Sequence, residues 1–296
     1  MNIVILGPGA IGSLWAYQLH HSGHQVALWG TQSLEHWSIS QDNRPAISYA
    51  YNQPSTLRHT DILLITVKAW QVAQALPPVL PHLAPETILI FMHNGMGALD
   101  SLTTEINHHP IVLATTTHGA QKNSPHHVMH TGKGMTQLGA YNAQGKQCEF
   151  LTEVFNHALP TVSWNPEMTH ALWHKLAINC VINPLTAIHQ CNNGALAQPQ
   201  YHSIIEQIIH ELVSVMQAES IPCDKAALTE SIYQVITATA KNHSSMQQDV
   251  VHQRQTEIDF ITGYLVKRAQ QHGLSIPTNL ELYQHIHSLQ QRWISQ

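Results

Sequence analysis

The first half of the chain alternates short apolar runs with segments in which apolar residues recur at helical spacing. A buried strand of a parallel sheet reads as a short apolar run, and two parallel strands need a crossover connection, usually a helix. The expected strands cover residues 2–6, 25–29, 62–67, 87–92 and 111–115. The helix-like segments cover residues 10–20, 69–75 and 98–106. This alternation predicts a doubly wound parallel sheet.

The pattern changes near Asn165, after which strands and helices no longer alternate. Just before that point we expect irregular strands or a hairpin in residues 124–141 and a closing helix in residues 148–158. Beyond it, apolar residues recur at helical spacing in residues 168–188, 204–216, 226–238 and 257–269. We therefore expect an α/β domain at 1–165 and an all-helical domain at 166–296, with the ligand site in the cleft between them.

Composition and charge narrow the classes of function. With 296 residues and 43% hydrophobic content, the chain can bury a substantial core, and its length favours two domains. The net charge is −5 and the 13 Lys and Arg residues are scattered singly, which argues against a surface for nucleic acid or anionic lipid. No charged leader precedes the first apolar run, and no apolar segment has the length of a membrane span. We expect a cytoplasmic protein that binds a small molecule.

The unusual number of histidines does not predict a metal site. The 24 histidines fall in every region of the chain, and they show no spacing typical of metal ligands. The four cysteines are widely spaced without a C-x-x-C pair, which indicates reduced, structural thiols. We therefore expect no metal.

A glycine motif at residues 7–12 follows an expected strand and opens an expected helix. It reads Gly7-Pro8-Gly9-Ala10-Ile11-Gly12. In this context the first glycine permits the tight turn, the second lets the backbone approach a pyrophosphate, and the third lets the helix pack on the sheet. Exposed amides and the helix dipole then hold the anion. The alternative is a glycine turn that binds no ligand.

The end of the second strand bears on the choice of cofactor. An NAD-specific protein usually carries an acidic residue about 20 positions after the glycine motif, where it bonds the ribose hydroxyls. Here the strand ends in Trp29-Gly30-Thr31-Gln32, and the first carboxylate is Glu35. A missing carboxylate removes the repulsion that excludes a 2′-phosphate, and Lys68, just after the third strand, is a candidate counter-charge. NADPH/NADP is favoured, although Lys68 is equally well explained as a solvated lysine.

Lys175, Asn179 and Asn183 stand four residues apart in an apolar segment, so they share one face of a helix. Pro184 does not fit a helix interior, so we expect a break or kink near Asn183. Burying a lysine and two amides in an apolar core without partners would cost free energy, whereas a polar oxyacid bound beside them would satisfy their hydrogen bonds and charge. The alternative is that this polar stripe faces water.

A second polar cluster occupies residues 242–246 and 256–259. On one straight helix Ser245 and Glu257 would be roughly 18 Å apart, too far for both to touch a small acid. Either the segment bends or one of the two residues contacts the cofactor. A helix cap at Ser244 or Ser245 is an equally good interpretation.

At these residues the chain resembles the ketopantoate reductase family, and the resemblance runs almost from end to end. The motifs that carry it are, in the family's order, Gly7–Gly12, Val67–Gln71, His93–Gly97, Thr115–His118, Leu172–Thr186, Ser244–Met246 and Thr256–Asp259. The resemblance implies a Rossmann-type domain followed by an all-α domain related to that of 6-phosphogluconate dehydrogenase. It also implies NADPH-dependent reduction of 2-dehydropantoate to pantoate, for pantothenate synthesis. We expect a monomer or homodimer.

The resemblance also implies roles for single positions, with Lys175 as the proton donor. The implied cofactor contacts are Gly7, Pro8, Gly9, Ala10, Ile11, Gly12, Lys68, Asn94, Ala120 and Glu257. The implied substrate contacts are Asn94, Lys175, Asn179, Asn183, Asn193, Asn242 and Ser245. Many family members carry an arginine for the 2′-phosphate at the end of the second strand, where this chain has Thr31.

Two other functions are consistent with the same scaffold. One is reduction of a different 2-keto acid, because a fold does not fix its substrate. The other is an NADPH-sensing regulator without catalysis, which would be marked by loss of the stripe that contains Lys175. The chain retains that stripe.

Overall fold

The computed structural model describes residues 1–294 of the chain, which divide into two compact units. Unit 1 consists of Met1–His93 and Ala98–Met168, and unit 2 consists of Asn94–Gly97 and the residues from Thr169 onward. The short segment 94–97 therefore leaves the first unit between two of its strands and belongs to the second. Among the described residues, no helix is long and apolar enough to cross a membrane.

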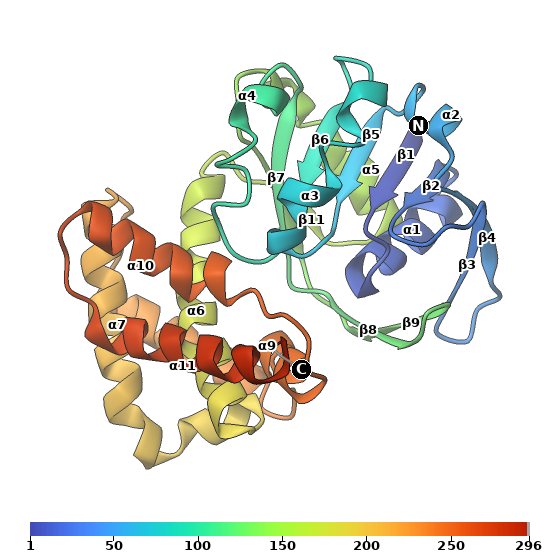
Figure 1. Cartoon of the computed structure of the whole chain (residues 1–296). Helices are drawn as coiled ribbons and strands as arrows, with labels where there is room; N and C mark the ends of the chain where they lie inside the picture. The colour runs from blue at the N-terminus through green and yellow to red at the C-terminus, as the bar shows by residue number, and fades with distance from the viewer. Residues whose placement is uncertain (295–296) are drawn as a thin grey trace. The chain divides into compact units, whose positions relative to one another are not determined.

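Unit 1 is built on an 11-stranded sheet in the order β11-β10-β7-β6-β5-β1-β2-β4-β3-β9-β8 (Figure 1). The six strands from β7 to β4 in this order are parallel, which confirms the predicted sheet. They are β1 (Asn2–Leu6), β2 (Gln25–Trp29), β4 (Ile47–Tyr51), β5 (Ile62–Ile65), β6 (Ile88–Phe91) and β7 (Ile111–Thr116). Leu6 lies opposite both Trp29 and Ile65, so the strands β1, β2 and β5 end side by side.

The remaining strands extend this sheet at both edges. They are β3 (His36–Gln41), β8 (Gly119–Ser124), β9 (His127–Gly132), β10 (Thr136–Ala140) and β11 (Val162–Trp164). Strands β8 and β9 form an antiparallel hairpin, which agrees with the hairpin expected near this region, although it begins earlier, at Gly119. The sequence did not predict β3, β4 or β11, because they are short and mix polar with apolar residues.

One face of the sheet is covered by α1 (Ala10–His21) and α5 (Leu151–Ala158). The rings of Trp15 and Phe155 lie 5.0 Å apart between these two helices. The other helical segments are single turns: α2 (Pro54–Leu57), η1 (Ala69–Gln71), α3 (Val72–Ala75), η2 (Leu80–His82), α4 (Thr103–Ile106) and η3 (Gln144–Cys148). The helix expected at 98–106 was therefore wrong over its first half, because such short segments take their conformation from context.

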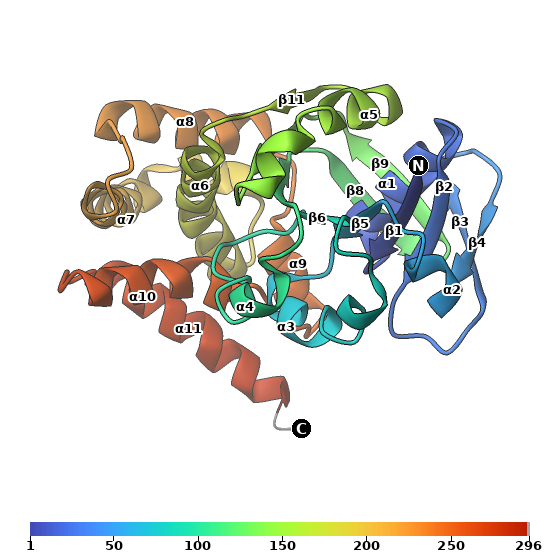
Figure 2. The same ribbon diagram turned by 90° about the horizontal axis from the view of Figure 1, so that it is seen from above.

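The described part of unit 2 is helical throughout (Figure 2). Its elements are α6 (Met168–His189), η4 (Asn193–Ala197), α7 (Pro199–Ala218), α8 (Lys225–Ala238), α9 (Ser245–Val251), η5 (Ile258–Phe260), α10 (Thr262–Gln271) and α11 (Pro277–Ile294). The buried face of α6 packs into a core with α7, through side chains such as Leu176, Leu185 and Leu212. Helices α10 and α11 lie side by side in both ribbon views (Figures 1 and 2).

Of the break or kink predicted near Asn183, the break was wrong, because α6 continues through Pro184 to His189. A proline inside a helix removes one backbone hydrogen bond and costs about 3 kcal/mol. Here the surrounding turn is fully buried, and packing of Val181 and Leu185 in the core of unit 2 offsets that cost. Pro184 does disfavour a continuous helix locally, but the packing of its neighbours in the core outweighs that preference.

The predicted helix at 257–269 was also placed too early. Glu257 precedes the short turn η5, and α10 begins only at Thr262. Helix α11 was not predicted, and α9 was anticipated only through the alternative of a helix cap at Ser244 or Ser245. The start of α11 is fixed from outside, because the buried carboxylate of Glu211 accepts hydrogen bonds from the backbone N–H groups of Thr278 (2.8 Å) and Asn279 (2.9 Å).

Candidate active site

The glycine loop of unit 1 has the geometry of a phosphate-binding turn. Gly7 follows β1 with a backbone φ of 89°, in the region that favours glycine. Its N–H donates to the carbonyl oxygen of Trp29 at 2.8 Å, which ties the loop to the end of β2. A Cβ on Gly12 would lie 2.5 Å from the carbonyl oxygen of Gly7. The turn and the close packing of α1 therefore require glycine at positions 7 and 12.

Gly9 is different, because nothing in the fold crowds it. A Cβ there would be 4.0 Å from its nearest neighbour in the described chain, and its φ of −69° suits any residue. Gly9 is the N-cap of α1, whose first turn has no acidic residue and no side-chain cap in the described structure. The first N–H groups of a helix have no partner within it and attract anions. The open space beside Gly9, which a side chain would fill, therefore lets a pyrophosphate approach the N–H groups at the start of α1.

This contrast predicts opposite effects for two alanine substitutions. Gly9→Ala should lower stability by only about 0.5 kcal/mol, the cost of alanine at a helix N-cap, and weaken binding of a nicotinamide dinucleotide at least about tenfold, because the Cβ occupies the approach to the amides. Gly12→Ala should destabilise the protein by about 1 to 3 kcal/mol through overpacking. Thermal melts and fluorescence titration with the reduced cofactor measure the two effects. Unchanged cofactor affinity in a folded Gly9→Ala protein would contradict the assignment of the loop.

The loop after β2 is held by side chains from the end of β4. Asn52 accepts a hydrogen bond from the N–H of Gly30 (2.8 Å) and donates to the carbonyl oxygen of Gln32 (2.6 Å). The hydroxyl of Tyr51 accepts from the N–H of Gln32 (3.3 Å). Thr31 is exposed between these anchors. The anchored part of the loop, residues 30–32, is therefore fixed and uncharged, which is compatible with a 2′-phosphate and offers it no cation of its own.

Lys68 and Ala120, two implied cofactor contacts, both belong to unit 1. Lys68 follows β5, the strand beside β1, and its backbone N–H donates to the side-chain oxygen of Gln71 (3.1 Å). Ala120 is half-buried on β8, which packs against α1. Both residues therefore lie in the same unit as the glycine loop, and their contacts with a cofactor stay predictions.

The polar stripe of α6 does not face water. Lys175 and Asn179 are half-buried, and Asn183 is only 6% exposed, whereas the neighbouring His174 is exposed. Burial disfavours the charged form of a lysine, and it lowers the pKa of Lys175 from 10.5 to about 8. The carboxylate of Glu257 acts in the opposite direction. Such a lysine can release its proton far more readily than one in water.

Glu257 and Asn94 lie together, although 163 positions separate them in the sequence. The side-chain amide of Asn94 donates to the carboxylate of Glu257 at 3.3 Å. The segment that carries Asn94 is anchored at η5, because the N–H of Met96 donates to the carbonyl oxygen of Phe260 (2.8 Å). Gly95 has a φ of 79°, and a Cβ there would collide with the same carbonyl group. The fold thus brings Asn94 next to Glu257, and the negative charge of Glu257 in turn acts on Lys175.

Asp259 holds the turn that carries Glu257. Its carboxylate accepts hydrogen bonds from the hydroxyl of Tyr283 (2.8 Å) and from the ring of His287 (2.7 Å), both on α11. Burial, together with the hydrogen bond to Asp259 and the negative charge of that residue, raises the pKa of Tyr283 to about 12. Sequence reasoning noted Asp259 but missed its two partners, because α11 was not predicted.

Asn193 and Asn242 come from different elements and meet through the backbone. The N–H of Asn193 donates to the carbonyl oxygen of Asn242 (2.9 Å), and its side-chain amide donates to the hydroxyl of Thr239 (2.9 Å). The side-chain oxygen of Asn193 is buried and accepts no hydrogen bond within the described chain. Asn242 itself is exposed. A buried acceptor without a donor is costly, which makes Asn193 a candidate ligand-binding residue.

Ser244 is the helix cap that the sequence offered as an alternative. Its hydroxyl accepts from the N–H of Gln247 (3.0 Å) at the start of α9 and is 2.7 Å from the hydroxyl of Thr186 on α6. The same Thr186 hydroxyl lies 2.7 Å from the carbonyl oxygen of Ile182 and 3.2 Å from that of Asn183. The chain leaves the helix after α9 and turns before η5, which is one of the two alternatives that the distance argument left open. Ser245, which is exposed, therefore starts a helix that is tied to the polar stripe.

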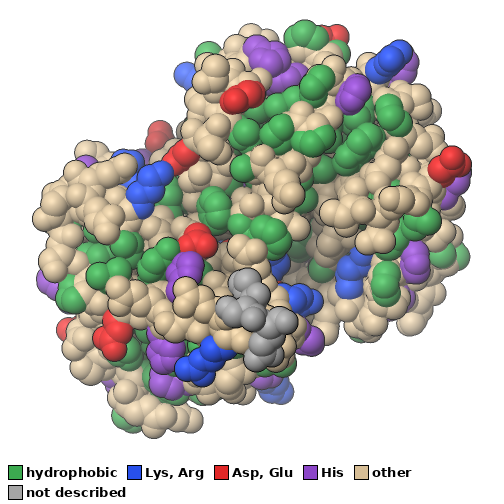
Figure 3. All heavy atoms as spheres, in the orientation of Figure 1, with side chains coloured by type: hydrophobic (Ala, Val, Ile, Leu, Met, Phe, Trp, Pro, Cys, Tyr) green, Lys and Arg blue, Asp and Glu red, His purple; other side chains and the backbone are tan. Residues whose placement is uncertain are grey.

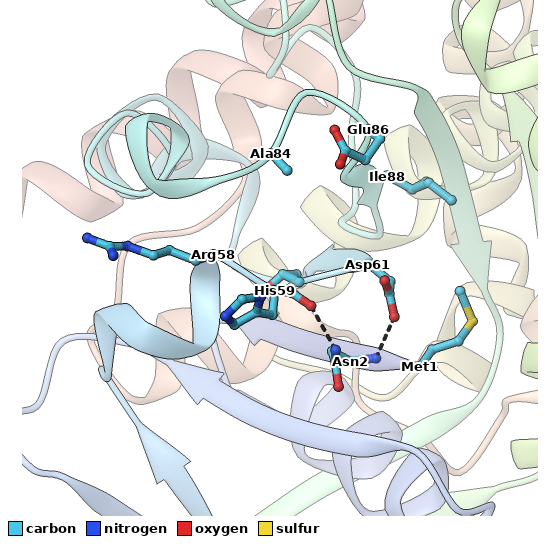
Figure 4. Close-up of a pocket in the computed structure, with 9 residues that line it drawn as sticks. Met1, Asn2, Arg58, His59, Asp61, Ala84, Glu86 and Ile88 are labelled. Carbon is cyan, nitrogen blue, oxygen red and sulfur yellow. Dashed lines mark hydrogen bonds between the residues drawn. The ribbon is translucent and has the colours of Figure 1, made fainter.

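A hollow at the opposite end of β1 contains none of these residues (Figure 4). It is lined by Asn2, His59, Asp61 and their neighbours. Asn2 donates from its backbone to Asp61 (2.7 Å) and from its side chain to the carbonyl oxygen of His59 (2.8 Å). Because these polar groups satisfy one another across the starts of neighbouring strands, we interpret the hollow as structural.

The abundant histidines are dispersed over the face drawn in Figure 3. No group of three or more metal-ligating side chains occurs within the described range. All four cysteines are free thiols, and burial raises the pKa of each of them, which disfavours the thiolate.

Two family models match the chain. The model described as ketopantoate reductase PanE/ApbA matches residues 3–143, and the model of the C-terminal domain of the same family matches residues 167–290. A protein from Vibrio cholerae serotype O1, named 2-dehydropantoate 2-reductase, is 57% identical over 293 residues, which is 99% of each chain. Another of that name, from Yersinia pestis, is 38% identical over 96% of this chain and 93% of its own.

A solved structure supports the same fold. The crystal structure of a probable 2-dehydropantoate 2-reductase from Bacillus subtilis superposes with a TM-score of 0.81 at 29% identity. The match covers 98% of this chain and all of that one.

Proposed function

The chain belongs to the ketopantoate reductase family, whose members are NAD(P)-dependent oxidoreductases, and on that premise we propose that it reduces 2-dehydropantoate with NADPH and that Lys175 supplies the proton. The product is pantoate, an intermediate of pantothenate and coenzyme A synthesis. We place the reaction in the cytoplasm. The observation that carries the proposal for the site is the half-buried Lys175 beside the carboxylate of Glu257, on a helix whose polar face also presents Asn179 and Asn183.

NADPH held at the glycine loop would supply hydride chemistry at the C2 carbonyl carbon of the substrate, so that negative charge would develop on the carbonyl oxygen. The ammonium of Lys175 donates a hydrogen bond to that oxygen, stabilises the charge and transfers its proton. A pKa of about 8 leaves Lys175 mostly protonated at neutral pH and makes it a stronger acid than a lysine in water. Glu257 keeps the ammonium form populated despite burial, and Asn94 holds that carboxylate in place.

The substrate carries a carboxylate, which needs hydrogen-bond donors, and a hydroxyl, which can itself donate to an unpaired acceptor. We assign them to the amides of Asn179, Asn183 and Asn193 and to the segment with Asn242 and Ser245. The support comes from burial and packing: Asn183 is buried, the side-chain oxygen of Asn193 lacks a donor, and Ser245 begins a helix joined to α6 through Ser244. An apolar pocket without such groups would lose the hydration energy of the acid without replacing it.

The proposed cofactor preference is tested by comparing dissociation constants for NADPH and NADH in fluorescence titrations. We expect tighter binding of NADPH, because the loop at Thr31 has no carboxylate to repel a 2′-phosphate and Lys68 follows a strand close by. Lys68→Ala should weaken NADPH binding and leave NADH binding unchanged. Equal affinities would show that Thr31 in place of an arginine has abolished the discrimination, and Lys68→Ala would then change little.

A further inference from the structure

Lys122, on β8, reaches the glycine loop. Its ammonium donates a hydrogen bond to the carbonyl oxygen of Pro8 at 2.8 Å, directly before the N-cap of α1. The side chain is half-buried, and burial lowers the pKa of the lysine. Neither the sequence pattern nor the family motifs pointed to this residue, because 114 positions separate it from Pro8.

The surroundings of Lys122 do not neutralise the positive charge of its half-buried ammonium. In the described chain no carboxylate forms an ion pair with Lys122, and its partners are a backbone carbonyl oxygen and an aromatic ring. The nearby N-terminus of α1 carries a partial positive charge, which repels a second cation. A half-buried cation in this setting is stabilised by an anion bound beside the loop. An ammonium has three donors, so the bond to Pro8 leaves two for such an anion.

The position of Lys122 indicates which part of a dinucleotide the anion belongs to. Its ammonium lies 5.8 Å from the ring centre of Trp37, and Trp37 stacks on Tyr51 with ring centres 5.4 Å apart. The hydroxyl of Tyr51 binds the N–H of Gln32, in the loop after β2. In a sheet of this type the adenosine ribose lies at the end of the second strand, whereas the pyrophosphate lies over the helix N-terminus. Lys122 is thus linked to the ribose side of the glycine loop.

We propose that Lys122 recognises the 2′-phosphate of NADPH and supplies the positive charge that Thr31 does not. This inference rests on the proposed function. The phosphomonoester accepts hydrogen bonds from the ammonium, while the bond to Pro8 and the packing against Trp37 fix the direction of the side chain. Lys122 is then a specificity-determining residue for the cofactor, in addition to the role proposed for Lys68.

The test varies both the residue at position 122 and the presence of the 2′-phosphate on the cofactor. Dissociation constants for NADPH and NADH, which differ only by that group, are measured by fluorescence titration for the wild type, Lys122→Gln and Lys122→Arg. Lys146→Gln, which removes an exposed lysine on η3 in the same unit, is the matched control for net charge. We expect Lys122→Gln to weaken NADPH about tenfold and NADH less than about twofold. Lys122→Arg should retain tight NADPH binding, and Lys146→Gln should change neither.

Three results would overturn the assignment. Equal weakening of NADPH and NADH by Lys122→Gln, in a protein that melts like the wild type, would mean that the lysine holds the loop or the pyrophosphate. Unchanged affinities would mean that it contacts no cofactor phosphate. The same loss in Lys146→Gln would indicate a general effect of charge. Each of these leaves the proposed reaction intact as long as the wild type binds NADPH and reduces 2-dehydropantoate, whereas wild-type protein without those two activities would refute the proposed function instead.

Discussion

Replacing Lys175 by alanine lowers kcat/KM for 2-dehydropantoate by at least roughly 100-fold, within the range of about 10² to 10⁴ that a positioned general acid contributes. The lysine stands half-buried beside Glu257, and alanine can neither donate a proton nor stabilise the charge on the carbonyl oxygen. Cofactor affinity should barely change, because the glycine loop that we assign to the pyrophosphate belongs to the other unit. Steady-state kinetics and a fluorescence titration measure the two quantities.

The pH profile separates an acid from a simple positive charge. The active form is the ammonium, so kcat/KM for reduction should be level below a pKa of about 8 and fall above it, as the lysine deprotonates. This limb should be absent in Lys175→Ala. Lys225→Ala, which removes a solvent-exposed lysine from α8, is the matched control and should keep both the rate and the limb. A folded Lys175→Ala protein with near wild-type turnover and the same alkaline limb would contradict the role of Lys175.

Replacing Asn183 by alanine raises the KM for 2-dehydropantoate far more than the KM for NADPH. The loss of one partner in a buried polar contact costs about 1 to 3 kcal/mol, which corresponds to a change of about 5- to 150-fold. Asn183 is 6% exposed on the same face of α6 as Lys175, so the substrate group that it binds would stay unpaired. The substrate dependence of the initial rate, measured for both ligands, gives the two KM values.

A matched control for this substitution is Asn107→Ala, because Asn107 is exposed and belongs to unit 1. It should leave both KM values unchanged. Thermal melts of both variants show whether the loss of Asn183 acts on substrate binding alone. Wild-type KM and turnover in a folded Asn183→Ala protein would remove the polar stripe of α6 from the substrate site.

The sequence predicts the parts of this fold in which local pattern and burial agree. The strands at Asn2–Leu6 and Gln25–Trp29 begin and end where expected, because each is an apolar run closed by a turn or a polar residue. Pro184 shows the limit of that reasoning: its local preference breaks a helix, but a core that only the folded chain assembles keeps α6 continuous. Helix α11 was missed because contacts from Glu211, far away in the sequence, fix its start.

In the candidate site, too, the sequence predicts the features that depend on local spacing and misses those that depend on long-range contacts. The spacing of Lys175, Asn179 and Asn183 on one helical face follows from the sequence alone, and so does the glycine loop. The contact between Asn94 and Glu257 does not, because no periodicity relates residues 163 positions apart. Lys122 escaped notice for a similar reason, since its place beside Pro8 depends on a hairpin that folds back onto α1.

The central claim is the reaction itself, and it is tested most directly by the steady-state oxidation of NADPH with a panel of 2-keto acids that includes 2-dehydropantoate. We expect the highest kcat/KM with 2-dehydropantoate, with one pantoate formed for each NADPH consumed. A higher kcat/KM with another 2-keto acid would make the chain a different reductase on the same scaffold, and no turnover of 2-dehydropantoate by folded, NADPH-binding protein would contradict the claim outright.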